Sequence, residues 1–142
     1  DTTPRTYAQR KAWVESHHDP YAVFVTTVPA TDAATEGGER IIGFSALSVF
    51  YDRAGYDGVT DLAYYIAPEW QGRGAGTFTL ARLLDECRNR HMRKACGIIF
   101  ADNRGSIALM KHFGFTQFGL MPQAATDSTG TMRDMSYWHL DL

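Results

Sequence analysis

The chain has few of the residues that cross-link or metallate small domains. Its only two cysteines, Cys87 and Cys96, lack the C-x-x-C spacing of redox and zinc motifs. Its five histidines are scattered, and no two lie four residues apart, as two metal ligands on one helical face would. We therefore predict two free, buried thiols and no metal site.

Long apolar runs and an excess of basic charge are also absent. No apolar run approaches the roughly 20 residues that cross a bilayer, and the opening segment DTTPRTYAQRK holds no apolar signal core. The formal net charge of -2 gives no general attraction to polyphosphate. We expect a cytoplasmic protein that binds neither a membrane nor nucleic acid.

The residues that are present suit one folded domain. With 142 residues, of which 44% are hydrophobic and 21% charged, the chain can bury a single sizeable core, so we predict one domain over residues 1–142. Its hydrophobic periodicities predict an α+β arrangement. The predicted helices cover residues 3–15, with Thr3 as N-cap, 76–91 and 106–113. The predicted strands cover residues 21–28, 40–50, 59–66, 94–101, 115–122 and 132–142, with a polar loop over 29–39.

A glycine-rich loop follows the predicted strand 59–66. Gly72, Gly74 and Gly76 let the backbone turn tightly and approach a ligand closely. The loop opens a helix, whose first amides lack partners and lie at the positive end of the helix dipole, an arrangement that suits a phosphate or pyrophosphate. The spacing fits neither G-x-x-x-x-G-K-[ST] nor G-x-G-x-x-G. The alternative is a tight strand-to-helix connection without a ligand.

Two segments carry a family resemblance. QGRGAG, from Gln71 to Gly76, matches the Q/R-x-x-G-x-G/A signature of the GNAT superfamily of acyl-CoA-dependent N-acyltransferases. DNRGSIALMKHFGF, from Asp102 to Phe115, resembles that superfamily's N-x-x-S-I-x-L-x-x-x-x-G-F segment. The stretches AQRKAWV, YAVFV, RAGYDGVTD and GLMPQ are similar to its phosphinothricin and methionine-sulfoximine acetyltransferase branch.

The resemblance implies the GNAT fold, an α+β domain whose central, mixed, mostly antiparallel twisted sheet is flanked by helices. The usual first strand and helix of the family have no counterpart ahead of AQRKAWV, so we expect a domain that is N-terminally incomplete relative to the family.

The resemblance also implies acetyl-CoA as co-substrate, with no metal. Backbone groups of Tyr64, Tyr65 and Ile66 would pair with the pantetheine arm as an added strand does. Asn103 and Ser106 would bind that arm from the other side. The residues whose amides would hold the pyrophosphate are Gln71, Gly72, Arg73, Gly74, Ala75 and Gly76.

Attack on a thioester requires a neutral amine, and because an alkyl ammonium titrates at about 10, a base must remove a proton. Asp61 is the candidate base, at a position where the branch has glutamate; alternatively, it only pairs with the turn before the strand. A backbone N–H at Tyr65 or Ile66 would stabilise the oxyanion. The family's proton donor to the leaving thiolate is replaced by Met110, which cannot donate, so Tyr65, Tyr64 or water would act instead.

The implied function is transfer of an acetyl group from acetyl-CoA to the primary amine of a small molecule by direct attack in a ternary complex. An amino acid or an analogue is one candidate acceptor. The alternative is a degenerate domain that binds acyl-CoA as a sensor or interaction module without turnover. Tyr51, Arg53 and Arg133 are candidate substrate-binding residues, although an arginine in such a place is more often a solvated surface residue. The chain could also form a homodimer.

Overall fold

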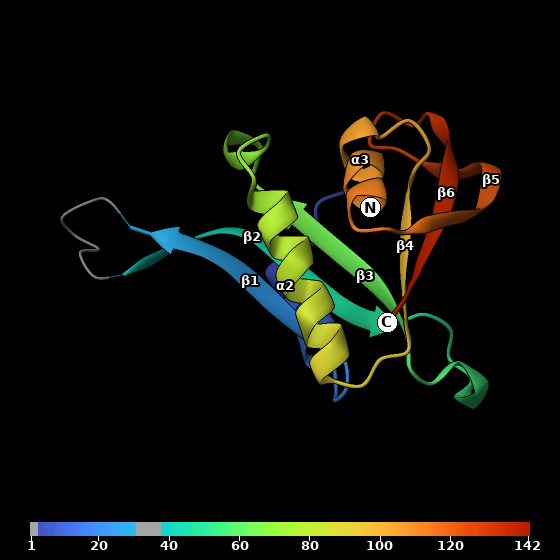
Figure 1. Ribbon diagram of the computed structural model, residues 1–142. Coiled ribbons are helices and arrows are strands. Elements are labelled where there is room, and N and C mark those ends of the chain that lie inside the picture. The colour runs from blue at the N-terminus through green and yellow to red at the C-terminus, as the bar shows by residue number, and fades with distance from the viewer. Residues whose placement is uncertain (1–2, 31–37) are drawn as a thin grey trace.

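The computed structural model describes residues 3–30 and 38–142, which form one mixed sheet with helices on both faces (Figure 1). The strand order is β1-β2-β3-β4-β6-β5, and only β3 and β4 run parallel. The strands are β1 (Ala22–Pro29), β2 (Glu39–Val49), β3 (Val59–Ile66), β4 (Lys94–Phe100), β5 (Thr116–Thr126) and β6 (Met132–Asp141). The helices are α1 (Tyr7–Glu15), α2 (Ala75–Asn89) and α3 (Arg104–His112), with short 3₁₀ helices η2 (Ala54–Tyr56) and η3 (Pro68–Trp70). The expected mixed, mostly antiparallel α+β sheet is confirmed.

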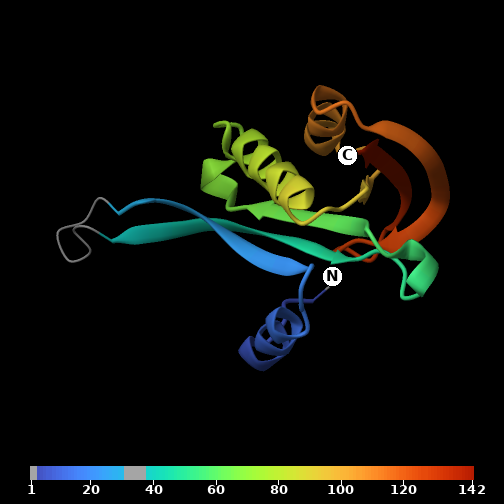
Figure 2. The same cartoon turned by 60° about the horizontal axis from the view of Figure 1, so that its bottom comes forward.

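Helices α2 and α3 cover one face of the sheet, and α1 lies on the other (Figure 2). Helix α2 buries Leu80, Leu83 and Leu84, whose spacing places them on one side, against Leu47 and Leu62 of the sheet. Each of these leucines contributes about 1.5–3 kcal/mol by leaving water. Both cysteines are free and buried, as predicted. Within residues 3–30 and 38–142, no helix is long and apolar enough to cross a membrane.

Helix α1 begins later than the sequence predicts. The Thr6 hydroxyl accepts a hydrogen bond from the Gln9 amide at 3.2 Å, and the Gln9 side chain accepts one from the Thr6 amide at 2.9 Å. This reciprocal capping box fixes Thr6 as the N-cap, because it satisfies two backbone donors at once. The prediction of Thr3 as N-cap is therefore wrong.

Most other predicted boundaries lie within two residues of those observed, with β5 as the exception. The predicted strand ends at residue 122, whereas β5 continues to Thr126 through two irregularities in its pairing with β6. Such irregularities break the alternation by which a strand is recognised. Of the predicted polar loop over 29–39, residues 31–37 lie outside the described residues.

Strands β3 and β4 pair over three residues only. Val59, Thr60 and Asp61 lie opposite Lys94–Cys96, after which the two strands separate (Figure 1). Strand β3 stays paired with β2 as far as Ile66, and β4 stays paired with β6 as far as Phe100. The facing edges of β3 and β4 beyond Asp61 therefore form a gap in the middle of the sheet.

Candidate active site

The glycine loop connects β3 to α2 at the wide end of this gap. Gly74 is the N-cap of α2 and adopts a left-handed backbone with φ of +88°. A Cβ atom there would meet nothing within 4 Å, so it would project into open space. At Gly76 a Cβ atom would come within 3.3 Å of the Leu109 side chain on α3. Gly74 therefore permits the turn, whereas Gly76 permits close packing of the two helices.

The amides of this loop are free. The first backbone bond of α2 runs from the Phe78 amide to the Gly74 carbonyl at 3.0 Å, and no side chain caps the helix. The N–H groups of residues 72–77 make no hydrogen bond to any residue that the structure describes. Several unpaired donors at the positive end of a helix dipole can bind an anionic ligand.

The side chains of the loop hold it in place. Gln71 donates to the Ile66 carbonyl at 3.0 Å, which ties the loop to the end of β3. The Arg73 guanidinium lies 4.1 Å from the centre of the Trp70 ring and donates to the Glu69 carbonyl at 3.4 Å. Arg73 has no carboxylate partner among residues 3–30 and 38–142, so its charge is available to an anion at the loop.

On the α2–α3 side of the sheet, a polar group is buried without a full partner. The Tyr64 hydroxyl is enclosed and meets no hydrogen-bond geometry with a described residue. Burial raises the pKa of Tyr64, and a weak interaction with the Ser106 side chain only partly offsets this effect. The Asn103 side-chain oxygen accepts the Ser106 amide at 3.1 Å and so caps α3. An orphaned buried hydroxyl is unfavourable, so this one suits a polar ligand that completes its bonding.

Asp61 lies where the gap begins. Ser48 stands directly opposite on β2, and Cys96 is in register on β4. Burial raises the pKa of the Asp61 carboxyl to about 6. In the described part of the chain, no hydrogen bond or ion pair joins Asp61 to the turn before the strand, so the alternative of a merely turn-paired aspartate finds no support. The result is a carboxylate without a counter-charge.

The two tyrosines of β3 lie on opposite faces, because side chains alternate along a strand. Tyr65 is 60% exposed and stacks on Phe44 of β2, with ring centres 4.8 Å apart.

Met110 is fully buried on α3, and a Cβ atom on Gly97 would lie 3.0 Å from its sulfur. Met110 thus packs tightly over β4, which explains in physical terms why an apolar residue stands here.

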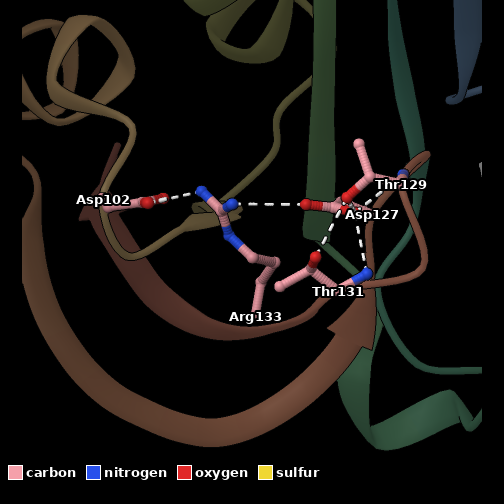
Figure 3. Close-up of polar contacts among 5 residues, drawn as sticks. All are labelled: Asp102, Asp127, Thr129, Thr131 and Arg133. Atoms are coloured by element: carbon pink, nitrogen blue, oxygen red, sulfur yellow. Dashed lines mark hydrogen bonds and ion pairs between the residues drawn. The ribbon is translucent and has the colours of Figure 1, made fainter.

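Arg133 is held by two carboxylates. Figure 3 shows its guanidinium between Asp102 and Asp127. Its Nη1 atom donates to the Asp127 carboxylate at 3.2 Å, and its Nη2 atom donates to the Asp102 carboxylate. Asp127 also accepts hydrogen bonds from Thr129 and Thr131, and these bonds lower its pKa. Arg133 therefore joins the β5–β6 turn to the start of α3, on a part of β6 that the register places well away from Asp61.

A cavity of about 410 Å³ lies beside Asp61 on the sheet. Val59 and Cys96, the strand neighbour and the register partner of Asp61, are in its lining. Its other lining side chains include Phe50, Tyr56, Phe118 and His139. Of the predicted substrate residues, Tyr51 packs edge-on against Tyr56, with ring centres 5.1 Å apart. The Arg53 guanidinium carbon lies 5.7 Å from the centre of the Tyr51 ring. Both stand next to the η2 end of the cavity.

Sequence reasoning missed Phe118 and His139 as lining residues. They lie on β5 and β6, far from Asp61 in the chain, and only the strand order brings His139 opposite Cys96. No local motif marks them.

Among the described residues, no group of three His, Cys, Asp or Glu side chains could hold a metal ion.

Comparison with known proteins gives one consistent result. The model of the acetyltransferase (GNAT) family matches residues 2–115. A phosphinothricin N-acetyltransferase of Streptomyces coelicolor is 31% identical over 121 residues, covering 84% of this chain and 67% of that protein. An L-methionine sulfoximine/L-methionine sulfone acetyltransferase of Pseudomonas aeruginosa is 27% identical over 141 residues, covering 99% and 77%.

This chain superposes with a TM-score of 0.78 on a solved structure of a GNAT superfamily phosphinothricin acetyltransferase from Sinorhizobium meliloti. That structure is a complex with acetyl-CoA. It is 26% identical, and the match covers 99% of this chain and 71% of that one. Because the family match spans most of the sequence and includes the glycine loop, this chain belongs to the acetyltransferase (GNAT) family.

Proposed function

We propose that this chain transfers the acetyl group of acetyl-CoA to the primary amine of a small, amino-acid-like molecule by direct attack in a ternary complex. The observation that carries the proposal is the layout of β3, which has a half-buried carboxylate at the start of the gap and free loop amides beyond its end. The relatives support the acceptor class, because their names include phosphinothricin, methionine sulfoximine and L-amino acids.

The residues around the gap fit coenzyme A. The free loop amides from Gly72 to Gly76 and the Arg73 cation would hold the pyrophosphate, whereas the Gln71 amide is already bonded to the Pro68 carbonyl at 3.2 Å. The free edge of β3 at Tyr64–Ile66 would pair with the pantetheine amides, and Asn103 and Ser106 would bind from α3. The orphaned Tyr64 hydroxyl supports this assignment, since a polar ligand in the gap would give it a partner. When bound, acetyl-CoA supplies an acetyl group activated as a thioester.

Asp61 would take the proton from the attacking amine. A carboxyl with a pKa of about 6 is largely ionised at pH 7, yet more basic than an ordinary aspartate. A backbone N–H at Tyr65 or Ile66 would donate to the oxyanion. For the leaving thiolate, Tyr64 would donate from the α2–α3 face and Tyr65 from the α1 face, with water as the third candidate.

The cavity beside Asp61 would accept the side chain of the amine substrate. Its phenylalanine and tyrosine side chains favour apolar or aromatic groups, and Arg93, Lys94 and His139 add polar groups to the lining. Tyr51 and Arg53 would then contact the rest of the acceptor, with Arg53 available to a carboxylate. For Arg133 to do so, a substrate carboxylate would have to displace Asp102 or Asp127.

A panel of amines tests the acceptor class. Free amino acids, their methyl esters, polyamines and short peptides would each be assayed by release of the CoA thiol. We expect free amino acids with apolar side chains to react fastest. If esters and simple amines react equally well, the amino-acid assignment is wrong although acetyl transfer stands.

The alternative is a CoA-binding module without turnover. It is not favoured, because the relatives are named acetyltransferases.

Three wider properties belong to the same proposal. We propose that residues 1–142 fold as a single domain, which limited proteolysis would check. We propose a cytoplasmic location and a small-molecule amine as the partner, without nucleic acid, membrane or metal. A homodimer is the assembly that we would test for first, by sedimentation of the purified chain.

A further inference from the structure

A hydrogen-bonded pair, His17 and Ser48, lies on the Asp61 side of the sheet. The His17 Nε2 atom is 2.8 Å from the Ser48 hydroxyl, and its Nδ1 atom is 2.8 Å from the Trp13 carbonyl. A carbonyl can only accept, so in the neutral ring Nδ1 carries the proton and Nε2 offers its lone pair. The Ser48 hydroxyl therefore donates to His17.

Ser48 connects this pair to Asp61. The two residues are directly opposed on antiparallel strands, so their side chains share a face, with Cβ atoms about 4.5–5.5 Å apart. The proposed route needs a rotation of the Asp61 carboxyl, or a single bridging water molecule, to span what remains. Asp61, Ser48 and His17 thus follow one another from the gap toward α1, where the half-buried His17 ring reaches solvent.

The other neighbours of Asp61 offer no such route. Cys96 is in register on β4, and burial together with Asp61 raises the pKa of its thiol to about 11. His139 stands beyond Cys96 on β6. Along β3, the neighbours of Asp61 on the same face are the apolar Val59 and Ala63, and Tyr65 lies beyond Ala63, stacked on Phe44. Helices α2 and α3 cover the opposite face of the sheet (Figure 2).

A base that has taken a proton from the amine must lose it before the next turnover. We propose that Ser48 and His17 carry this proton from Asp61 to solvent. The O–H bond of the Asp61 carboxyl breaks as its proton passes to the Ser48 oxygen, while the Ser48 proton passes to His17 Nε2. Asp61 returns to the carboxylate, and the His17 imidazolium releases its Nε2 proton to water, which restores the form with the proton on Nδ1. The inference rests on the proposed role of Asp61 as the base.

Substitutions along the route test the inference. Ser48→Ala removes the middle carrier, and His17→Gln keeps a polar group near Ser48 that cannot carry a proton. We expect each to lower kcat at pH 7 by about tenfold, less than loss of the base itself, and to leave the thermal unfolding midpoint nearly unchanged. High concentrations of imidazole buffer should restore the rate by accepting the proton directly. The matched control is His18→Gln on the neighbouring exposed histidine, which should behave as wild type.

Wild-type turnover in both Ser48→Ala and His17→Gln would overturn the relay, and so would a loss that buffer does not restore. A separate readout needs no turnover: nitrogen-15 NMR of the free protein should show the His17 proton on Nδ1, and a proton on Nε2 would refute the route. Asp61→Asn distinguishes failure of the relay from failure of the base assignment. If Asp61→Asn is slow while Ser48→Ala and His17→Gln are not, only the relay fails. If Asp61→Asn also turns over normally, the base assignment fails as well.

Discussion

Asp61 on β3 and Cys96 on β4 are the last residues in register before the two strands separate. The carboxylate therefore stands at the junction between a continuous sheet and the gap. Its location explains two of its properties together. The paired strands and the core bury it enough to raise its pKa, and the open edge beyond it leaves room for a ligand on the adjacent backbone.

The first prediction concerns the glycine loop. Gly74→Val should abolish CoA binding, because a β-branched residue is strained at φ of +88° and its side chain would occupy the approach to the loop amides. Calorimetric titration of CoA measures the effect. Gly130→Val is the matched control, since Gly130 has φ of +84° and equally open surroundings but lies in the β5–β6 turn. Unchanged affinity in a folded Gly74→Val protein would refute the loop assignment.

The second prediction concerns the base. Asp61→Asn should lower kcat/KM by about 10²- to 10⁴-fold near pH 7, the usual contribution of a positioned base. In the wild type, kcat/KM should rise as pH passes through about 6, where the Asp61 carboxyl ionises. The deficit of the variant should shrink at high pH, because the free amine then loses its own proton. Equal rates at pH 7 would exclude this role for Asp61.

The third prediction links the same residue to stability. Burial raises the pKa of Asp61 from 3.8 to about 6, so the folded state favours the protonated form. The stability contributed by this protonation is fully present below pH 3.8 and is lost as pH rises through about 6. Asp61→Asn should therefore raise the thermal unfolding midpoint more at pH 7.5 than at pH 4. A difference between variant and wild type that does not change with pH would show that the carboxyl is well solvated.

The fourth prediction concerns the buried hydroxyl. Tyr64→Phe removes an enclosed hydroxyl that makes no well-formed hydrogen bond with a described residue and only interacts with Ser106, so the free protein should be as stable as wild type or slightly more stable. Turnover should nevertheless fall, because the hydroxyl would act toward the bound ligand. Tyr65→Phe, on the exposed face, provides the comparison. If Tyr64→Phe lowers the unfolding midpoint and leaves kcat unchanged, the hydroxyl is structural.

The fifth prediction separates the two arginines. Arg53→Ala should reduce the preference for a free amino acid over its methyl ester, because the guanidinium of Arg53 has no carboxylate partner in the described parts of the chain. Arg133→Ala should instead lower the unfolding midpoint, because Asp102 and Asp127 lose their shared cation. The acid-to-ester ratio of kcat/KM is the measurement. A ratio that depends on Arg133 alone would reverse the two roles.

Local signals predicted part of this molecule well. The bounds of β3 are those predicted, because Gly58 and Pro68 bracket an apolar run that neither residue can continue. The glycine loop was predicted to present free amides at a helix start, and no described residue bonds the N–H groups of residues 72–77. Such features depend on backbone chemistry that neighbouring residues determine.

Relationships between distant segments could not be read in this way. The carboxylates that hold Arg133 come from the start of α3 and from the β5–β6 turn, and no spacing marks them as partners. His139 reaches the cavity only because β6 inserts between β4 and β5. The helix start at Thr6 was missed because Thr3-Pro4 is also a good opening signal, and only the contact with Gln9 decides between them.

Turnover itself tests the account most directly. Purified protein would be mixed with acetyl-CoA and increasing concentrations of an apolar amino acid at pH 7.5, with release of the free CoA thiol followed continuously. We expect thiol release that depends on the amine concentration and saturates as that concentration rises. Tight binding of CoA without any amine-dependent release of thiol, across the whole panel of amines, would contradict it.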